Sequence, residues 1–344
     1  MTIRRIAILA APVAAALTLY GLRAGGQTQK PVAATGSGSW RSAVGNLAEG
    51  KWGDFGLHHA VSVPGRREII AGVSGRGLFA SSDGGVTWKK LGAEGDLNGR
   101  PQQVTFDPDN PNIFWATCIY GSNIYRTRDG GATFEVIKPG GGETISVDFT
   151  DPDRRTLLTA SHELGNTLML SVTSGRTWHS LAENIPPGLS LQPNAFLYGD
   201  TIIACSTSAS RPGIFRSTDS GRNWTQVSTS VAGWRAPRFG KKPGQIYWAG
   251  SVRGFIRSDD GGKTWASLGG PIMGAPTELE DGTLVGFGEK SLFRSSDIGV
   301  TWRPFGPPFP FVPWGMFYNE RLHTYFIFHF TGTGDRTALM KWTP

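Results

Sequence analysis

Short apolar runs alternate with clusters of turn-forming residues along almost the whole chain. In one stretch, QQVTF (102–106) and IFWATC (113–118) flank the turn sequence DPDNPN. Such runs, rich in β-branched and aromatic residues and bounded by Gly, Pro, Asn and Asp, are typical of β-strands. Helix-favouring runs of Ala, Leu, Glu and Lys are scarce after the first thirty residues. The pattern therefore predicts an all-β fold built from many short strands.

One turn recurs six times, and we name its eight-residue motif the box. The copies begin at Ser81 (SSDGGVTW), Thr127 (TRDGGATF), Ser171 (SVTSGRTW), Ser217 (STDSGRNW), Ser258 (SDDGGKTW) and Ser295 (SSDIGVTW). Their third positions are separated by 46, 44, 46, 41 and 37 residues. Strand-like runs flank every copy, so that each unit has four of them. A unit of about forty residues with four strands is the signature of a β-propeller blade.

The box residues are predicted to be structural. Glycine supplies the positive φ of a tight turn between the third and fourth strands, and the short acidic side chain accepts hydrogen bonds from nearby backbone N–H groups. The tryptophan starts the outer strand and wedges its ring against neighbouring structure. One carboxylate per box does not make a calcium site, which needs about six to eight oxygen ligands. The residues assigned to this structural role are Asp83, Asp129, Asp219, Asp260, Asp297, Trp88, Trp178, Trp224, Trp265 and Trp302.

In its boxes and their spacing the chain resembles the Asp-box (BNR repeat) β-propellers over roughly residues 40–344. That superfamily includes sialidases, xyloglucan-cleaving glycosidases, sortilin-type receptor ectodomains and photosystem II assembly factors. The resemblance implies a propeller, but it does not imply one activity, because one superfold hosts many functions.

The sequence departs from the enzymes of this superfamily in two places. It lacks the Arg-Ile-Pro motif of sialidases. The loop VSGRG (73–77) lacks the acid that xyloglucan-cleaving enzymes carry between the second and third strands of their first blade. Length, predicted blade number and export signal resemble the assembly factors most, which act as protein-binding scaffolds.

The two ends of the repeat region predict how the ring closes. After the sixth box, the C-terminal stretch contains the runs PWGMFYN, LHTYFIFHF and RTALMKW, which make three strands without a fourth. Ser39 and Trp40 mimic the Thr-Trp pair that starts the fourth strands. We therefore predict a seven-bladed propeller in which residues 39–44 complete the last blade, which also removes two free sheet edges. A six-bladed ring with a decorated end is the alternative.

The first residues differ from the repeats. Arg4 and Arg5 precede an apolar run from Ile6 to Leu22, followed by small residues, which is the layout of a secretory signal peptide. Removing residues 1–24 takes away three arginines and no acid, so the formal net charge falls from +7 to +4. The expected organisation is a signal peptide (1–24), a flexible linker (25–38) and a propeller (39–344). The expected location is periplasmic or extracellular, with an uncleaved membrane anchor as the alternative.

Function is expected on the face opposite the boxes, because loops that vary on a rigid scaffold carry function. These are the loops that lead into each first strand and those that join second to third strands. Weak catalytic candidates there are Glu163, His162, His58 and His59, with a solvated turn as the alternative for the histidine pair. Candidate ligand-binding residues are Arg76, Tyr120, Glu143, Arg211, Trp234, Arg235, Arg253, Glu289, Lys290 and His329. For Trp234 and Trp314, core or channel lining is the favoured interpretation.

These residue types fit an anionic or sugar-like ligand, because arginine forks suit carboxylates and aromatic faces suit rings. The favoured function is an exported ligand-binding, protein-binding or assembly module. The alternative is a carbohydrate-active enzyme, either a sialidase-like glycoside hydrolase or a polysaccharide lyase. No metal, cofactor or nucleic acid is expected, and a monomer with a glycan or protein partner is predicted. Cys118 and Cys205 fall in different blades and are predicted to be free, buried thiols.

Overall fold

The computed structural model describes residues 38–97, 99–120, 123–161, 167–191, 195–233, 235–251, 253–330 and 335–344. The predicted signal peptide (1–24) lies outside the described residues, as does the predicted linker apart from Gly38. The chain divides into two units, Met1–Ala33 and Ala34–Pro344, and the fold described below belongs to the second. No helix among the described residues is long and apolar enough to span a membrane.

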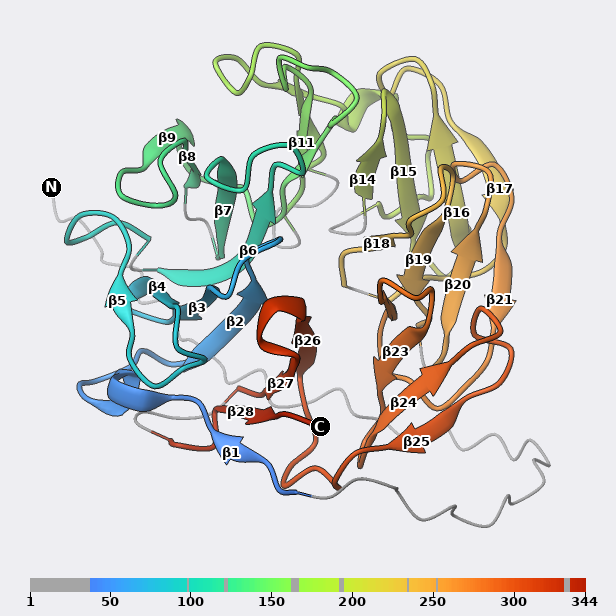
Figure 1. Ribbon diagram of the computed structural model, residues 1–344. Coiled ribbons are helices and arrows are strands. Elements are labelled where there is room, and N and C mark those ends of the chain that lie inside the picture. The colour runs from blue at the N-terminus through green and yellow to red at the C-terminus, as the bar shows by residue number, and fades with distance from the viewer. Residues whose placement is uncertain are drawn as a thin grey trace, which may run out of the picture. The chain divides into compact units, whose positions relative to one another are not determined.

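The strands form seven antiparallel sheets of four strands each, and these sheets follow one another around a ring (Figure 1). Blade 1 comprises β2 (Leu57–Ser62), β3 (Ile69–Val73), β4 (Gly77–Ser81) and β5 (Lys89–Lys90). Blade 2 comprises β6 (Arg100–Phe106), β7 (Phe114–Ile119), β8 (Ile124–Thr127) and β9 (Glu135–Lys138). Blade 3 comprises β10 (Ser146–Val147), β11 (Leu157–Thr159), β12 (Met169–Ser171) and β13 (His179–Ser180).

The same plan continues through the second half of the chain. Blade 4 comprises β14 (Ala195–Tyr198), β15 (Thr201–Ser206), β16 (Gly213–Ser217) and β17 (Thr225–Ser228). Blade 5 comprises β18 (Arg238–Phe239), β19 (Ile246–Ala249), β20 (Phe255–Ser258) and β21 (Ala266–Leu268). Blade 6 comprises β22 (Thr277–Glu278), β23 (Leu284–Phe287), β24 (Leu292–Ser295) and β25 (Arg303–Phe305). Three short 3-10 helices lie between strands: η1 (Gly45–Ala48), η2 (Ala182–Asn184) and η3 (Glu320–Leu322).

Blade 7 joins the two ends of the described chain. It comprises β26 (Gly315–Asn319), β27 (Thr324–Phe328), β28 (Leu339–Trp342) and β1 (Arg41–Ser42), and Figure 1 shows the blue β1 beside the red β28. Arg41 pairs with Lys341, and Ser42 pairs with Met340. The prediction of seven blades closed by residues 39–44 is therefore confirmed, and the six-bladed alternative is wrong.

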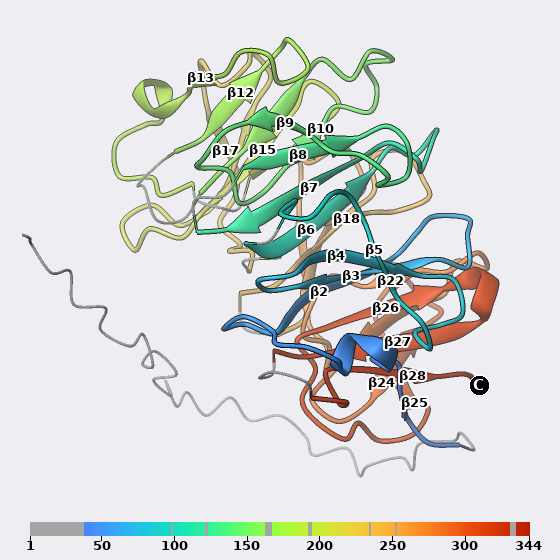
Figure 2. The same cartoon turned by 90° about the vertical axis from the view of Figure 1, so that its left-hand side faces the viewer.

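The core consists of apolar layers between neighbouring blades. Around the closure, Ala43, Val44 and Leu47 pack with residues of blade 1 and blade 7, among them Phe326 and Leu339. In Figure 2 the blue helix η1, which carries Leu47, accordingly lies beside β27. Cys118 and Cys205 are buried and free, as predicted.

The box turns fold as the sequence predicts. In the first copy, Asp83 accepts hydrogen bonds from the Val86 N–H (3.0 Å), the Thr87 N–H (2.9 Å) and the Thr87 hydroxyl (2.6 Å). Ser81 donates its hydroxyl to Asp83 and accepts the Gly85 N–H. The other four acidic boxes repeat this pattern. The motif therefore carries its own hydrogen-bond partners for the turn.

The third box keeps the turn without an acid. Thr173 Oγ1 accepts the Thr177 N–H at 2.9 Å, while Ser171 Oγ accepts the Gly175 N–H at 2.9 Å. Trp178 donates its indole N–H to the carbonyl of Ile137, which belongs to the preceding blade. The box is thus both a turn and a contact between blades.

Replacing Asp83 by alanine is expected to lower the free energy of unfolding by about 0.5–2 kcal/mol near neutral pH, as for the loss of a comparable side-chain cap. Burial raises the pKa of Asp83, but hydrogen bonds from Thr87 and Ser81 outweigh it and lower the pKa to about 2. An unfolded aspartate titrates near about 3.9. The stabilisation is therefore present above about pH 4 and is lost as the pH falls toward 2. Urea unfolding of the unaltered protein and of the Asp83→Ala variant, each at pH 7 and pH 2.5, would measure this loss of stability.

The Thr173→Ala variant is the matched control, because it removes an uncharged acceptor from the same turn position. Its destabilisation should be the same at both pH values. An Asp83→Ala effect that does not shrink in acid would show that the ionised carboxylate is not what stabilises the turn.

Candidate functional site

The two faces of the ring carry different loops. Because each blade is an antiparallel meander, its box turn lies on the same side as the loop between its first and second strands. The loops that lead into the first strands and those that join second to third strands lie on the opposite side, which we name the box-free face. The first strands are innermost, since β2 contacts β6 and β26, and β10 contacts β14.

Four aromatic side chains form a continuous row on the box-free face, which we name the aromatic arc. Tyr120 lies 5.8 Å from Phe55, Phe55 lies 6.2 Å from Phe330, and Phe330 lies 4.3 Å from Trp314, measured between ring centroids. These residues follow β7 or β27, or precede β2 or β26, and so come from blades 2, 1 and 7. Trp314 is 46% exposed and Tyr120 is 39% exposed, so part of each side chain is open to solvent.

Backbone contacts fix both ends of the arc. Tyr120 has a positive φ of 64°, which is uncommon for a bulky residue and often marks a functional loop. Its N–H donates to the carboxylate of Glu143 at 2.9 Å, and Glu143 is fully buried. At the other end, the Trp314 N–H donates to the Phe328 carbonyl at 2.7 Å. Both exposed rings are therefore held by the scaffold.

An arginine lies against each end of the arc. The Arg100 guanidinium lies 5.1 Å from the ring centroids of both Phe55 and Tyr120, and its Nε donates to Asp54 at 2.9 Å. The Arg235 guanidinium lies 4.5 Å from Trp314 and 5.7 Å from Phe287. Arg235 forms no ion pair with any described residue, unlike Arg100.

The adjacent histidines lie behind the arc. His58 is only 7% exposed and stacks on Phe330 at 4.5 Å, so the alternative of a solvated turn is wrong. Burial lowers the pKa of His58 to about 4. Burial and the nearby charges of His58 and Arg238 lower the pKa of His59 to about 3. Both imidazoles are therefore neutral near pH 7.

Arg238 links the innermost strands of three blades. It extends from β18 and donates to the Thr277 hydroxyl on β22 (2.6 Å) and to the Met316 carbonyl on β26 (3.1 Å). A side chain of blade 5 can reach blade 7 past blade 6 only on the inner side of the ring. Arg238 and His59 thus lie toward the ring axis beneath the box-free face.

Most of the remaining sequence candidates contact local partners. Arg76 donates to the Leu47 carbonyl and Arg211 to the Pro187 carbonyl. Arg253 pairs with Glu289 across blades 5 and 6. His329 stacks on Phe311 at 3.9 Å, and burial lowers its pKa. Lys290 is exposed at the end of its loop.

Three sequence candidates, His162, Glu163 and Trp234, lie outside the described residues. The sequence also did not single out Phe55, Phe330, Arg100 or Arg238. Phe55 and Phe330 do occupy the predicted loops, next to selected residues, so their position was the available signal. The interpretation of Trp314 as a core residue is wrong, because nearly half of its surface is exposed, whereas its interpretation as channel lining stays a prediction.

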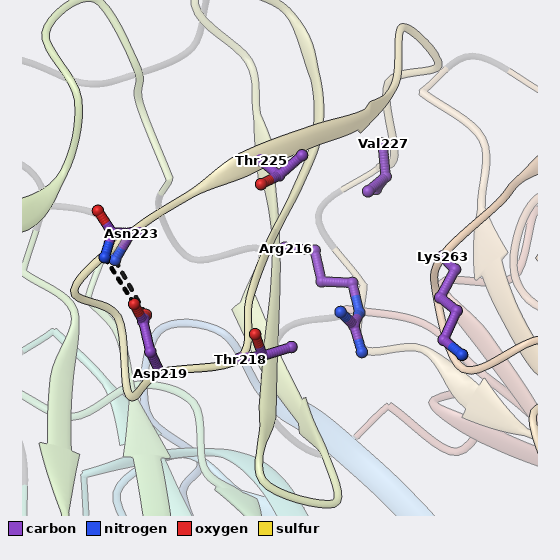
Figure 3. A pocket seen from close by; sticks show the side chains of 7 residues that line it. All are labelled: Arg216, Thr218, Asp219, Asn223, Thr225, Val227 and Lys263. Atoms are coloured by element: carbon purple, nitrogen blue, oxygen red, sulfur yellow. Dashed lines mark hydrogen bonds between the residues drawn. The ribbon is translucent and has the colours of Figure 1, made fainter.

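The opposite side of the ring, which carries the box turns and which we name the box face, has a hollow with a volume of about 260 Å³ (Figure 3). It lies between blades 4 and 5 and is lined by Arg216, Thr218, Asp219, Asn223, Thr225, Val227 and Lys263. Asp219 and Asn223 are occupied by the hydrogen bonds of the fourth box, as the dashed lines in Figure 3 show. This hollow is formed by the residues of a box turn, whereas the aromatic arc is built from loops without a repeated pattern.

Among the described residues, no three His, Cys, Asp or Glu side chains gather in a way that would hold a metal ion.

Comparison with known proteins supports the fold. The chain matches no protein-family model. A xyloglucanase from a Paenibacillus species is 26% identical over 218 residues, covering 59% of this chain and 20% of the relative. The GH74 xyloglucanase from Xanthomonas campestris has a TM-score of 0.57 at 17% identity, covering 89% of this chain and 55% of that one. The chain therefore spans about a fifth of the length of the first relative and about half of the second.

A third similarity concerns a protein of comparable extent. The structure described as YCF48 bound to D1 peptide has a TM-score of 0.56 at 15% identity, covering 91% of this chain and 97% of that one. At such identities the likeness to the two solved structures shows the propeller fold alone.

Proposed function

We propose that this chain is an Asp-box propeller that binds a polysaccharide across its box-free face. The observation that carries the proposal is the aromatic arc, in which two exposed rings lie on blades 2 and 7 with two further rings between them. Sugar rings present flat C–H faces that pack on aromatic rings, while their hydroxyls bond to polar groups nearby. Binding sites commonly combine such apolar surfaces with a few placed polar groups.

The arrangement suits an extended chain better than a single sugar. The arc runs from blade 2 through blade 1 to blade 7, and Trp314 and Tyr120 lie near its two ends. A polymer lying along the arc could contact both rings at once. Two linked contacts strengthen binding without either being tight. The sequence relative named as a xyloglucanase supports a carbohydrate ligand, and the six boxes support the Asp-box class.

Binding without hydrolysis is favoured by the state of the carboxylates. Glycoside hydrolysis needs a pair of carboxyl groups, of which one stays protonated near neutral pH. On the described part of the box-free face, Asp54 bonds to Arg100, Glu143 to the Tyr120 N–H and Glu289 to Arg253. Every described carboxylate whose pKa departs from its ordinary value has it lowered.

A hydrolase is the second candidate, because the relatives named above are xyloglucanases. Glu163 and His162 would then be the residues to test, since the sequence predicts them in a loop of the same face. Binding of a protein partner is the third candidate function. It is supported by the peptide-bound YCF48 structure, which this chain matches over nearly the whole length of both chains. The predicted export of the chain stays a prediction.

The test is a binding titration of the purified protein with neutral and acidic plant and bacterial polysaccharides, xyloglucan included. We expect saturable binding of at least one polymer, with dissociation constants in the micromolar to millimolar range. Release of new reducing ends is measured in the same samples. Binding without release supports the proposal, and release that is lost in Glu163→Gln favours the hydrolase. Failure of every polymer to bind would contradict a carbohydrate function and favour a protein partner.

A further inference from the structure

Arg235 differs from the other arginines described on the box-free face. Arg100 is neutralised by Asp54 and Arg253 by Glu289, while Arg76 and Arg211 donate to backbone carbonyls. The guanidinium of Arg235 donates no hydrogen bond to a described residue and pairs with no described carboxylate. Its planar group lies on the rings of Trp314 and Phe287 instead.

This stacking leaves the hydrogen-bonding edge of Arg235 without a partner among the described residues. A guanidinium that lies over an aromatic face keeps its N–H groups pointing outward in its own plane, where they match the two oxygens of a carboxylate. The backbone beside it is also fixed, since the Arg235 carbonyl accepts the indole N–H of buried Trp248 at 2.8 Å. The fork is therefore preorganised at the edge of an exposed tryptophan.

A second positive charge lies close to the first. Arg238 is held by Thr277 and Met316, both uncharged partners, and its charge acts on Arg235. Burial and then the charge of Arg238 lower the pKa of Arg235 to about 10, so that Arg235 stays charged at neutral pH. His59, which also lies near Arg238, is neutral at that pH. Two partly buried arginines, neither of which pairs with a carboxylate of the described residues, leave a positive field that an anionic ligand would relieve.

We propose that Arg235 binds the carboxylate of a uronic acid residue whose sugar ring, or that of its neighbour, packs on Trp314. The ligand class is thus an acidic polysaccharide with carboxylated sugars, which differs from the xyloglucan named for the relatives. This inference rests on the proposed function, because it uses the same aromatic arc. Arg235 supplies charge and direction, Arg238 adds to the field beneath it, and Trp314 supplies the contact area.

The experiment compares each acidic oligosaccharide with its carboxyl-reduced form. The probes are oligomers of polygalacturonate, alginate and hyaluronan, titrated into the purified protein by calorimetry beside the reduced oligomers and xyloglucan. For an acidic oligomer that binds, reduction of its carboxylates should weaken binding at least about tenfold, within the range that charge-assisted contacts provide. Arg235→Gln should abolish this difference while keeping the weaker binding of the reduced form. Arg235→Lys, which keeps the charge but loses the fork, should retain only part of the difference.

Arg303→Gln is the matched control, because it removes the same charge from an exposed position on the outer strand β25. It should leave the preference for the acidic form unchanged, and thermal unfolding of all variants checks that they fold. Equal binding of acidic and reduced forms by the unaltered protein would overturn the inference, as would an equal loss of preference in Arg303→Gln. Binding of xyloglucan alone would overturn it while leaving the proposed function intact. If none of the saccharides bound, both this inference and the proposed function would be overturned.

Discussion

Replacing Trp314 by alanine is expected to weaken polysaccharide binding at least about tenfold, with little change in stability. The indole is an exposed ring of the aromatic arc and also supports Phe330 and Arg235. Its removal takes away the contact area for a sugar and loosens the two groups beside it. Aromatic anchors of this kind commonly account for about 2 kcal/mol or more of binding energy, and about 1.4 kcal/mol corresponds to tenfold in affinity. Calorimetric titration of the unaltered protein and of the Trp314→Ala variant with the polymer that binds would measure the loss of affinity.

Phe239→Ala provides a control of the same kind on the other side of the ring. Phe239 is 48% exposed, nearly as much as Trp314, but it lies at the end of β18 toward the box face, near Phe196 and Tyr198. Binding by this variant should match that of the unaltered protein. Equal weakening in both variants would mean that stability rather than the arc decides binding. Weakening in Phe239→Ala alone would place the ligand on the box face.

Starting the chain at Gly45 instead of Gly38 is expected to lower the free energy of unfolding by roughly 4–8 kcal/mol, the range for losing a few well-packed apolar side chains. The shorter chain lacks β1 and with it the buried Trp40, Ala43 and Val44. Trp40 also donates its indole N–H to the Pro307 carbonyl. The midpoint of thermal unfolding should fall by about 10 °C for a protein of this size. Thermal unfolding followed by circular dichroism measures this directly.

The shorter chain should also associate, because β28 would become an unpaired edge. Light scattering of the two chains at equal concentration tests that second consequence. A synthetic peptide of residues 38–44 should restore part of the lost stability if pairing with β28 is what matters. Equal unfolding midpoints for the two chains would show that the ring does not depend on its closure.

The fold could be predicted because its signals are local. Each box contains the donor, the acceptor and the glycine of its turn, as Ser81, Asp83 and Gly85 show. The copy with Thr173 keeps the turn because a hydroxyl replaces the carboxylate as acceptor. The closure of the ring could also be predicted from the sequence, since Trp40 follows Ser39 as tryptophan follows threonine in most of the boxes. Such features need no knowledge of what lies elsewhere in the ring.

The candidate site was only partly predictable, because its neighbours are distant in sequence. The sequence singled out Tyr120 and Arg235 in the loops of the box-free face, next to the other residues of the aromatic arc. It gave no means of telling Arg235 from Arg253, since the pairing of Arg253 with Glu289 arises between blades. It likewise favoured core or channel lining for Trp314, because tryptophans in such loops more often have these positions than that of a stacking platform. Phe330 gained its role only through contacts with Trp314, Phe55 and His58.

The sequence by itself thus determined the blade, the turn and the number of repeats, all of which depend on residues a few positions apart. The tertiary structure decided which side chains meet at the top of the ring, which charges find a partner and which rings stay exposed. Arg100 and Arg235 illustrate the difference: both lie on aromatic rings, but among the carboxylates of the described part of the chain only Arg100 meets one, that of Asp54 on the neighbouring blade. Hydrogen bonds within a turn are set by chain connectivity, whereas contacts between blades are set by how seven sheets pack around one axis.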